Sequence, residues 1–334
     1  MKNYIIPIFI PHLGCQNECI FCNQRKISGS LKPIEAKDIK ARIEEYLKYY
    51  DKKEEKIIEV AFFGGSFTGI DLEKQVEYLE AVQPYIESKQ VNYIRCSTRP
   101  DYIDEKILIT LKKYNVKIIE LGVQSLDEEV LLTAKRGHTV EDVEKASKLI
   151  KDFGFILGHQ IMIGLPKSNL QKEIETVKKS IEMGPELVRL YPVLVINQTK
   201  LNDMYHNNEY IPLTIEEAVE HTKILFEMYT KANVNVIRVG LHVTEDLQAE
   251  SSFVAGPMHP AFGQMVTSRI IRDKFIEKIK GIDKDIIEVE ANEKTINNLV
   301  GVKKQNLEFI KKNYNKELKL KVNNSIKTDD IKLR

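Results

Sequence analysis

The chain has 334 residues, of which 43% are hydrophobic and 30% charged, and its formal net charge is +1. This composition is typical of a folded globular protein with one large and one smaller unit, and it excludes a largely disordered chain. It also excludes binding of polyanions by bulk charge, although residues 302–334 carry nine lysines and one arginine against four acids, so we expect any nucleic-acid contact near the C-terminus.

The N-terminal stretch 3–17 is free of charge apart from one neutral histidine, but it is too short to cross a bilayer and contains two prolines. No small-residue cleavage site follows it. We therefore expect no membrane contact, and a cytoplasmic location in which clustered thiols stay reduced.

Short apolar runs alternate with helical patterns along the first 240 residues. The apolar runs that predict strands are 2–12, 57–63, 92–98, 116–123, 155–165, 186–195 and 234–243. The patterns that predict helices are 35–50, 71–87, 101–114, 127–134, 140–152, 170–182 and 214–231, the last opening with a capping box at Thr214 and Glu217. This alternation predicts an α/β fold with a parallel sheet, either a partial TIM-type barrel of six βα units or a doubly wound sheet. Glycines and polar residues follow many successive strands, which favours a barrel mouth.

Three of the four cysteines, Cys15, Cys19 and Cys22, lie in a polar loop directly after the first apolar run. The fourth, Cys96, lies within a predicted strand. Three thiolates so close in sequence can bind one small metal cluster and leave one metal position open to a ligand, an arrangement that supports chemistry. The alternatives are a small zinc-binding motif or a redox-active cysteine loop.

This C-x-x-x-C-x-x-C spacing resembles the signature of the radical S-adenosylmethionine (SAM) enzymes, and the order of further motifs resembles the branch related to the catalytic subunit of Elongator. The segments that carry the resemblance are GCQNECIFCNQRKISG (14–29), FGGSF (63–67), STRPD (97–101), ELGVQS (120–125), RGHT (136–139), MIGLP (162–166), VRLYPVLV (188–195) and AGPMHPAFGQMVTSR (255–269). In that family three thiolates hold a [4Fe-4S] cluster whose fourth iron binds SAM, and one electron releases a 5′-deoxyadenosyl radical. The resemblance implies that Cys15, Cys19 and Cys22 are the cluster ligands and that a flavodoxin or ferredoxin supplies the electron.

The same resemblance implies a SAM site at the ends of several strands. Gly64 and Gly65 would present backbone groups to the SAM amino group, since a side chain would block close approach. The other residues expected at SAM are Phe21, Ser66, Glu120, Gln124, Ser125, Gly164, Leu165 and Arg189. Glu120 shares a strand face with Gln124, so we expect a buried carboxylate paired with Arg95, Arg99 or Arg189. The sequence assigns no catalytic residue.

After the barrel, predicted for residues 1–240, residues 241–334 form a predicted C-terminal extension. Its segment 255–269 holds too many glycines and prolines for a plain helix before Phe262, and predicts a loop packed at the barrel mouth.

Residues 280–334 predict a small βααβ unit. Its expected elements are a strand at 285–291, helices at 293–300 and 305–314, and a strand at 318–322. The sequence around Gly301 resembles the loop of the KH module, with Lys304 where the second glycine would be. Lys303, Lys304, Lys311 and Lys312 would then contact phosphates. The alternative is an ordinary lysine-rich helical hairpin.

Three functions remain open from the sequence. The favoured one is a radical SAM enzyme that modifies RNA, with a tRNA base as the expected substrate. The second is a radical SAM enzyme on a small molecule, as in oxygen-independent coproporphyrinogen oxidation, which the segment 120–125 also resembles. The third is a non-catalytic iron-sulfur protein. Elongator-type enzymes carry an acetyltransferase domain after the barrel, and we expect a compact bacterial relative without it.

Overall fold

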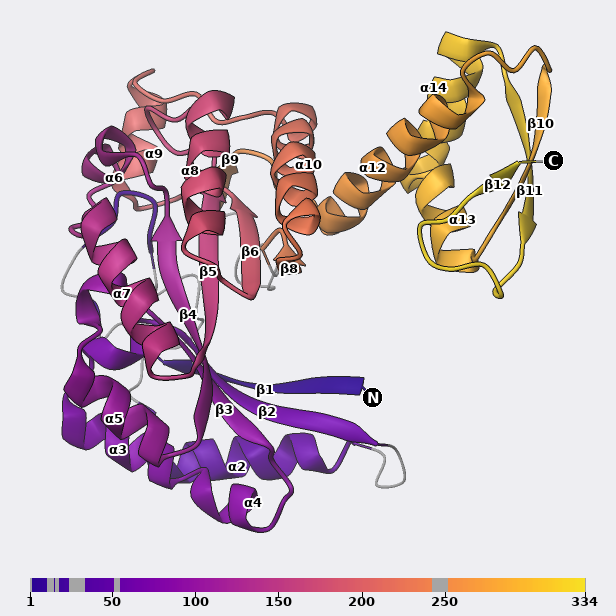
Figure 1. The fold of residues 1–334 in the computed structure, drawn as a ribbon. Coiled ribbons are helices and arrows are strands. Elements are labelled where there is room, and N and C mark those ends of the chain that lie inside the picture. The colour runs from indigo at the N-terminus through magenta and orange to yellow at the C-terminus, as the bar shows by residue number, and fades with distance from the viewer. Residues whose placement is uncertain are drawn as a thin grey trace.

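The computed structural model describes residues 2–10, 15, 18–23, 34–50, 55–241 and 252–333. Its main feature is a seven-stranded sheet in which all neighbouring strands are parallel. The strands are β1 (Lys2–Ile10), β2 (Lys56–Gly64), β3 (Tyr93–Thr98), β4 (Val116–Gln124), β5 (Ile156–Ile163), β6 (Leu187–Pro192) and β8 (Asn235–Val239). The sheet curls into a half-barrel with helices on its outer side (Figure 1).

The strands lie in the order β1-β2-β3-β4-β5-β6-β8, which is their order in the chain. A doubly wound sheet needs a point at which the strand order reverses, so that alternative is wrong. The partial TIM-type barrel of six βα units followed by one more strand is confirmed.

The two faces of the sheet differ because successive side chains on a strand point to opposite sides. On β1, Ile6, Ile8 and Ile10 are at most 1% exposed and belong to the main hydrophobic core beneath the helices. Their neighbours Ile5 and Phe9 are each 39% exposed on the concave side. The outer face therefore supplies the core, and the concave face is left for polar and ligand-binding residues.

The helices of the half-barrel follow the predicted pattern with corrections. They are α2 (Ala36–Leu47), α3 (Leu72–Glu80), α4 (Gln83–Glu87), α5 (Glu105–Lys113), α6 (Glu128–Thr133), α7 (Val140–Asp152), α8 (Leu170–Glu182), α9 (Lys200–His206) and α10 (Ile215–Lys231). The capping box at Thr214 and Glu217 is confirmed. No described helix is long and apolar enough to cross a membrane.

Two predicted helices are interrupted. The single helix predicted over 71–87 is wrong, because Pro84 lies in the first turn of a new short helix and has no N–H with which to continue α3. The helix predicted over 101–114 starts later, because the Asp104 side chain accepts a hydrogen bond from the Ile107 N–H (2.7 Å) and caps α5 there.

The strand predicted over 186–195 is also divided. Proline ends β6 at Pro192, and the chain then forms β7 (Val195–Ile196), which pairs with β9 (Phe253–Ala255) in a separate antiparallel ribbon. The short helix α9 that follows was not predicted, although the Thr199 side chain caps it by accepting from Asn202 N–H (3.1 Å).

The chain leaves the half-barrel through α12 (Phe262–Ile279), which begins at the residue up to which the sequence excluded a plain helix. The predicted loop therefore ends before Phe262 and does not extend to residue 269. Gly263 permits this packing, because a Cβ at that position would lie 3.0 Å from the Val239 carbonyl oxygen at the end of β8.

The residues after α12 form a small unit with its own sheet, which we call the C-terminal unit (280–333). Its elements are β10 (Ile286–Ala291), α13 (Glu293–Val300), the single turn η4 (Val302–Lys304), α14 (Gln305–Tyr314), β11 (Glu317–Val322) and β12 (Lys332–Leu333). The predicted βααβ order is confirmed, and β10 pairs parallel with β11 and antiparallel with β12. Figure 1 shows this unit set apart from the half-barrel at the far end of α12.

Candidate functional site

The candidate site lies at the carboxyl ends of β1 to β6, where parallel strands bring their last residues to one edge. The cysteine segment reaches this edge directly after β1. Residue 14, residues 16 and 17 and residues 24–29 of the cysteine motif lie outside the described part of the chain.

Hydrogen bonds attach the described part of the cysteine segment to two distant elements. The Ile20 N–H donates to the Ala134 carbonyl at the end of α6 (3.2 Å), and the Ile20 carbonyl accepts from the Leu201 N–H at the start of α9 (2.8 Å). A turn in which the Cys22 N–H donates to the Cys19 carbonyl (3.0 Å) brings the backbone of these two cysteines together. The segment is thus positioned by backbone contacts over the sheet edge.

Two of the three thiols lie against polar groups from different strands. The Cys15 sulfur is 3.4 Å from the Ser66 hydroxyl, which directly follows the glycine pair after β2. The Cys19 sulfur accepts a hydrogen bond from Arg136 Nη1 (3.1 Å). Within the described ranges, no three His, Cys, Asp or Glu side chains are grouped so as to hold one metal ion, so the convergence of the three thiols on one cluster stays a prediction.

The chemistry of this donor set nevertheless fits an iron-sulfur cluster. Thiolates are the usual protein ligands of iron-sulfur clusters, and hydrogen bonds to the ligand sulfurs are a common second layer of support. Arg136 already supplies such a bond to Cys19. Cys15 and Cys22 are half-buried and Cys19 is buried, so the segment is only partly open to solvent.

Two buried arginines, Arg136 and Arg99, lie near Cys19, and the sequence did not predict this arginine pair. Arg136 is 6% exposed, its Nη2 donates to the Gly122 carbonyl (2.6 Å), and its Nε has no partner among the described residues. Arg99 is close enough to interact electrostatically with Cys19; both ends of the Asp101 carboxylate bind it, and its Nη1 is also without a described partner. Burying a guanidinium nitrogen without a hydrogen-bond partner costs free energy, so this arginine pair suits an anionic group.

His138, from the same RGHT motif as Arg136, is buried beside these two arginines. Burial and the positive charges of Arg136 and Arg99 lower the pKa of His138 to about 3. The ring is therefore neutral at physiological pH and adds no further positive charge beside the arginine pair.

The glycine pair after β2 has a clear steric requirement. Gly64 has φ = +97°, and a Cβ there would lie 2.7 Å from the Ile10 carbonyl oxygen. That same oxygen accepts a hydrogen bond from the Gly65 N–H (3.1 Å). Only glycine fits at Gly64, and the pair holds the end of β1, and so the start of the cysteine segment, against β2.

Gln124 and Ser125 at the end of β4 have different surroundings. Gln124 has φ = +65°, is 9% exposed, and its Oε1 has no partner among the described residues. A Cβ at the neighbouring Gly122 would lie 3.0 Å from Gln124 Nε2 and 3.3 Å from Arg136 Nη2, so glycine leaves room for both side chains. The Ser125 hydroxyl instead accepts from the Asp127 N–H (3.2 Å) and supports the turn into α6. Contact of either residue with SAM stays a prediction.

Phe21 and Leu165, both predicted to contact SAM, pack in the same hydrophobic cluster at the site edge. The preceding Gly164 has φ = +84°; its N–H donates to Glu173 (2.7 Å) and its carbonyl accepts from the Tyr210 hydroxyl (2.6 Å). The structure thus brings together residues from the cysteine segment and from the end of β5.

Below the edge, charged side chains fill the concave side of the half-barrel. Glu120 is 1% exposed, and its carboxylate accepts from Arg95 (2.7 Å), from Gln160 (3.2 Å) and from two nitrogens of Arg189. The predicted pairing with Arg95 and Arg189 is confirmed, and pairing with Arg99 is wrong. Glu59, which sequence reasoning missed, is the second partner of Arg95 (2.8 Å).

Although burial opposes ionisation, Arg189 and Arg95 lower the pKa of Glu120, so its carboxylate is charged. All four of its acceptor positions are in use. This geometry gives Glu120 and Arg189 a positioning role beneath the site, and direct contact with SAM stays a prediction for both.

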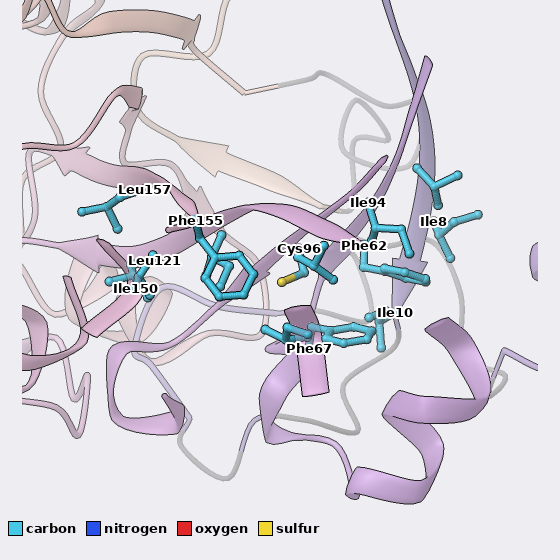
Figure 2. Packing of buried hydrophobic residues seen from close by; sticks show 14 of the residues in the cluster. Ile8, Ile10, Phe62, Phe67, Ile94, Cys96, Leu121, Ile150, Phe155 and Leu157 are labelled. Carbon is cyan, nitrogen blue, oxygen red and sulfur yellow. The ribbon is translucent and has the colours of Figure 1, made fainter. Parts of the chain in front are cut away.

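Cys96 lies away from the edge, within the hydrophobic core. Figure 2 shows Cys96 within a cluster of apolar side chains that includes Phe62, Ile94 and Leu121. Burial raises the pKa of the Cys96 thiol, so it is a poor source of thiolate. The predicted separation of Cys96 from the other three cysteines is confirmed. The lysines predicted to bind RNA lie in the C-terminal unit, apart from this edge (Figure 1).

Comparisons with known proteins agree with this geometry. Residues 9–179 match the model of the radical SAM superfamily, and residues 185–272 match that of the radical SAM C-terminal domain. The chain is 35% identical over 201 residues to the tRNA uridine(34) acetyltransferase of Methanocaldococcus jannaschii, covering 54% of this chain and 37% of that protein. It is 26% identical over 249 residues to Elongator complex protein 3 of Bos taurus, covering 63% of this chain and 45% of that protein.

Among solved structures, the chain is similar to Methanocaldococcus infernus Elp3 lacking its N-terminal 46 residues. The TM-score is 0.62 at 26% identity, over 85% of this chain and 64% of that chain. The matches span 37% and 45% of the length of the two curated relatives from M. jannaschii and Bos taurus, which is well under two thirds. Since the superfamily model matches half of the sequence and the half-barrel carries the cysteine segment at its carboxyl edge, the chain belongs to the radical SAM superfamily.

Proposed function

We propose that this protein is a radical SAM enzyme that binds a [4Fe-4S] cluster through Cys15, Cys19 and Cys22 and cleaves SAM reductively. The observation that carries the proposal is the attachment of the cysteine segment to the carboxyl edge of the half-barrel. It lies there beside the glycine pair and the buried arginine pair. When bound, the cluster would supply one electron to the SAM sulfonium, giving methionine and a 5′-deoxyadenosyl radical. The electron would come from a reduced flavodoxin or ferredoxin.

The chain's own residues would orient SAM. The unpartnered nitrogens of Arg136 and Arg99 suit the methionine carboxylate, because a guanidinium binds a carboxylate through strong charge-assisted hydrogen bonds. Gly64 and Gly65 would let the amino group approach the backbone. Phe21 and Leu165, which share one apolar cluster, would contact adenine, and Gln124 would bind the ribose.

We further propose that the substrate is a base in tRNA. Three of the similar proteins are tRNA uridine(34) acetyltransferases, which supports this substrate class. We do not propose acetyl transfer for this chain, since the match covers only 37% of the M. jannaschii protein.

The test is anaerobic reconstitution with iron and sulfide, followed by dithionite reduction with SAM. We expect about four irons per chain and release of 5′-deoxyadenosine. Replacing Cys15, Cys19 and Cys22 together by alanine should abolish both. Cys96→Ala is the matched control and should keep both, because its thiol is buried in the core.

Loss of the cluster in Cys96→Ala, at unchanged thermal stability, would overturn the ligand assignment. A protein that holds the cluster but releases no 5′-deoxyadenosine would instead be a non-catalytic iron-sulfur protein. To test the substrate, modified nucleosides in tRNA would be compared between a deletion strain and its parent; identical profiles would count against tRNA.

A further inference from the structure

We propose that the turn between α13 and α14, formed by Gly301, Val302, Lys303 and Lys304, is an RNA-binding surface that contacts the phosphate backbone of the substrate. We call these four residues the lysine turn. The inference rests on the proposed action on tRNA and adds to it the part of the chain that holds the RNA.

The lysine turn belongs to a unit that the superfamily comparison does not explain. The family models end at residue 272, whereas the C-terminal unit continues to residue 333 around its own hydrophobic core. That core joins β10, α13 and α14 to the last turns of α12. Figure 1 shows the unit beyond the half-barrel along α12, and Val302 of the turn packs against the cluster that α12 forms with α10. The exposed surface of the unit is available to a ligand larger than SAM.

The turn is held rigidly by a buried asparagine. Asn306 is 1% exposed, and its Nδ2 donates to the Asn298 carbonyl of α13 (3.1 Å) and to the Ser268 carbonyl of α12 (3.0 Å). Gly301 has φ = +78°, and a Cβ there would lie 3.0 Å from the Asn306 side chain. The turn is therefore pre-ordered before any ligand binds, which lowers the entropic cost of binding.

Two consecutive lysines in this turn adopt a backbone conformation that favours glycine. Lys303 has φ = +51° and Lys304 has φ = +63°, both in the left-handed region. For an L-residue this conformation costs on the order of 1 kcal/mol, and glycine would remove the strain. Glycine would also gain more freedom in the unfolded chain, so the two effects offset one another, and both lysines can be replaced by glycine without a large change in stability.

The charges of the turn are unpaired, in contrast to those on the open sheet face of the same unit. Lys303 and Lys304 are exposed and make no ion pair with any side chain in the described ranges. On the sheet face, Lys319 pairs with Glu288 (4.0 Å) and Lys321 with Glu290 (3.6 Å).

Lys311, also predicted as a phosphate contact, pairs with Glu317 (2.7 Å), whereas Lys312 is exposed and without a described ion pair. Residues 302–316 hold five lysines and one acid. The turn itself carries no aromatic ring on which a base would stack. These features favour contact with phosphates, which orient RNA without reading its sequence.

The test compares two double variants that each lose two positive charges. Lys303→Gly with Lys304→Gly removes the charges of the turn and keeps a backbone that glycine adopts freely. Lys319→Thr with Lys321→Thr removes two lysines from the sheet face and is the matched control. The probe is a fluorescently labelled, unmodified tRNA transcript, titrated with the full-length protein from 50 to 300 mM KCl.

We expect the turn variant to bind tRNA roughly tenfold more weakly at low salt, and its log–log salt slope to fall by about one to two units, since each lost phosphate contact removes about 0.7 to 0.9 of a unit. The control should keep the wild-type slope and bind within about twofold of the wild type. SAM cleavage without RNA should be unchanged in both variants, because the lysines lie outside the half-barrel.

Wild-type affinity and slope in the turn variant would overturn the proposal while leaving tRNA as the substrate; the turn would then serve another anionic partner, such as an acidic protein. An equal loss in both variants would also overturn it, since net charge and not the turn would then hold the RNA. A wild-type protein that binds no tRNA would overturn both this proposal and the substrate class.

Discussion

The charged residues inside the half-barrel and those of the C-terminal unit are used in opposite ways. Within the half-barrel, Glu59, Arg95, Glu120 and Arg189 are almost fully buried and pair with one another. In the C-terminal unit, Lys303 and Lys304 are exposed and unpaired, while the neighbouring lysines of the sheet face are paired. Buried, mutually paired charges fix the geometry of a site, whereas exposed, unpaired charges are available to a partner.

The largest effect is expected from breaking the buried network. Glu120→Ala would leave the guanidinium groups of Arg95 and Arg189 buried without their shared counter-charge. Removing one partner of a buried ion pair typically costs about 3–5 kcal/mol of unfolding free energy. The measurement is denaturant unfolding of the cluster-free protein. Glu288→Ala, which removes an exposed pair on the sheet face, is the control and should cost less than about 1 kcal/mol. Equal losses of unfolding free energy in both variants would show that the buried network stabilises the fold no more than an exposed ion pair does.

A smaller effect is expected at Arg136, which is buried beside Cys19 and whose Nε has no described partner. If this nitrogen binds the carboxylate of SAM, Arg136→Leu removes a charge-assisted hydrogen bond of roughly 1.5–3 kcal/mol. SAM affinity should then fall by about 10- to 100-fold in protein with full iron content, as measured by equilibrium dialysis. Lys145→Ala on the exposed side of α7 removes the same charge and should leave affinity unchanged. Unchanged affinity in Arg136→Leu would mean that this arginine supports only Cys19 and Gly122.

The smallest effect concerns the fold of the C-terminal unit. The variant with Lys303→Gly and Lys304→Gly should unfold within about 1 kcal/mol of the wild type, because relief of the left-handed strain offsets the greater freedom of glycine in the unfolded chain. Thermal unfolding measures this difference. A loss above about 2 kcal/mol would show that the lysines stabilise the fold, so that weaker tRNA binding by this variant could no longer be assigned to their charge alone.

Much of the fold could be predicted because apolar runs and helical patterns are local signals. The helices α7, α8 and α14 agree with the predicted ranges at both ends. The errors arise where a single residue overrides a longer pattern. Pro84 divides a helix and Pro192 ends a strand, although the hydrophobic pattern continues past both.

The site was predictable only where residues are close in sequence or carry a motif. The cysteine spacing and the glycine pair are such cases. The contact of Arg136 with Cys19 spans 117 positions and depends on how α6 returns to the sheet edge, which no local pattern encodes. Glu59 was missed because a carboxylate inside an apolar run gives no sign of its partner; the alternation of strand faces, which placed Glu120, was the signal available for it.

The helix α12 has a further consequence, because one continuous helix takes part in two hydrophobic cores. Phe262, Met265 and Val266 pack with α10 of the half-barrel, whereas Phe275 and Ile279 belong to the core of the C-terminal unit. The two cores are joined by this one helix and not by a flexible linker. We therefore expect the two parts to unfold together rather than one after the other. Truncation at residue 280 would leave Phe275 and Ile279 facing water, and a protein shortened there would be prone to aggregate before its loss of function could be interpreted.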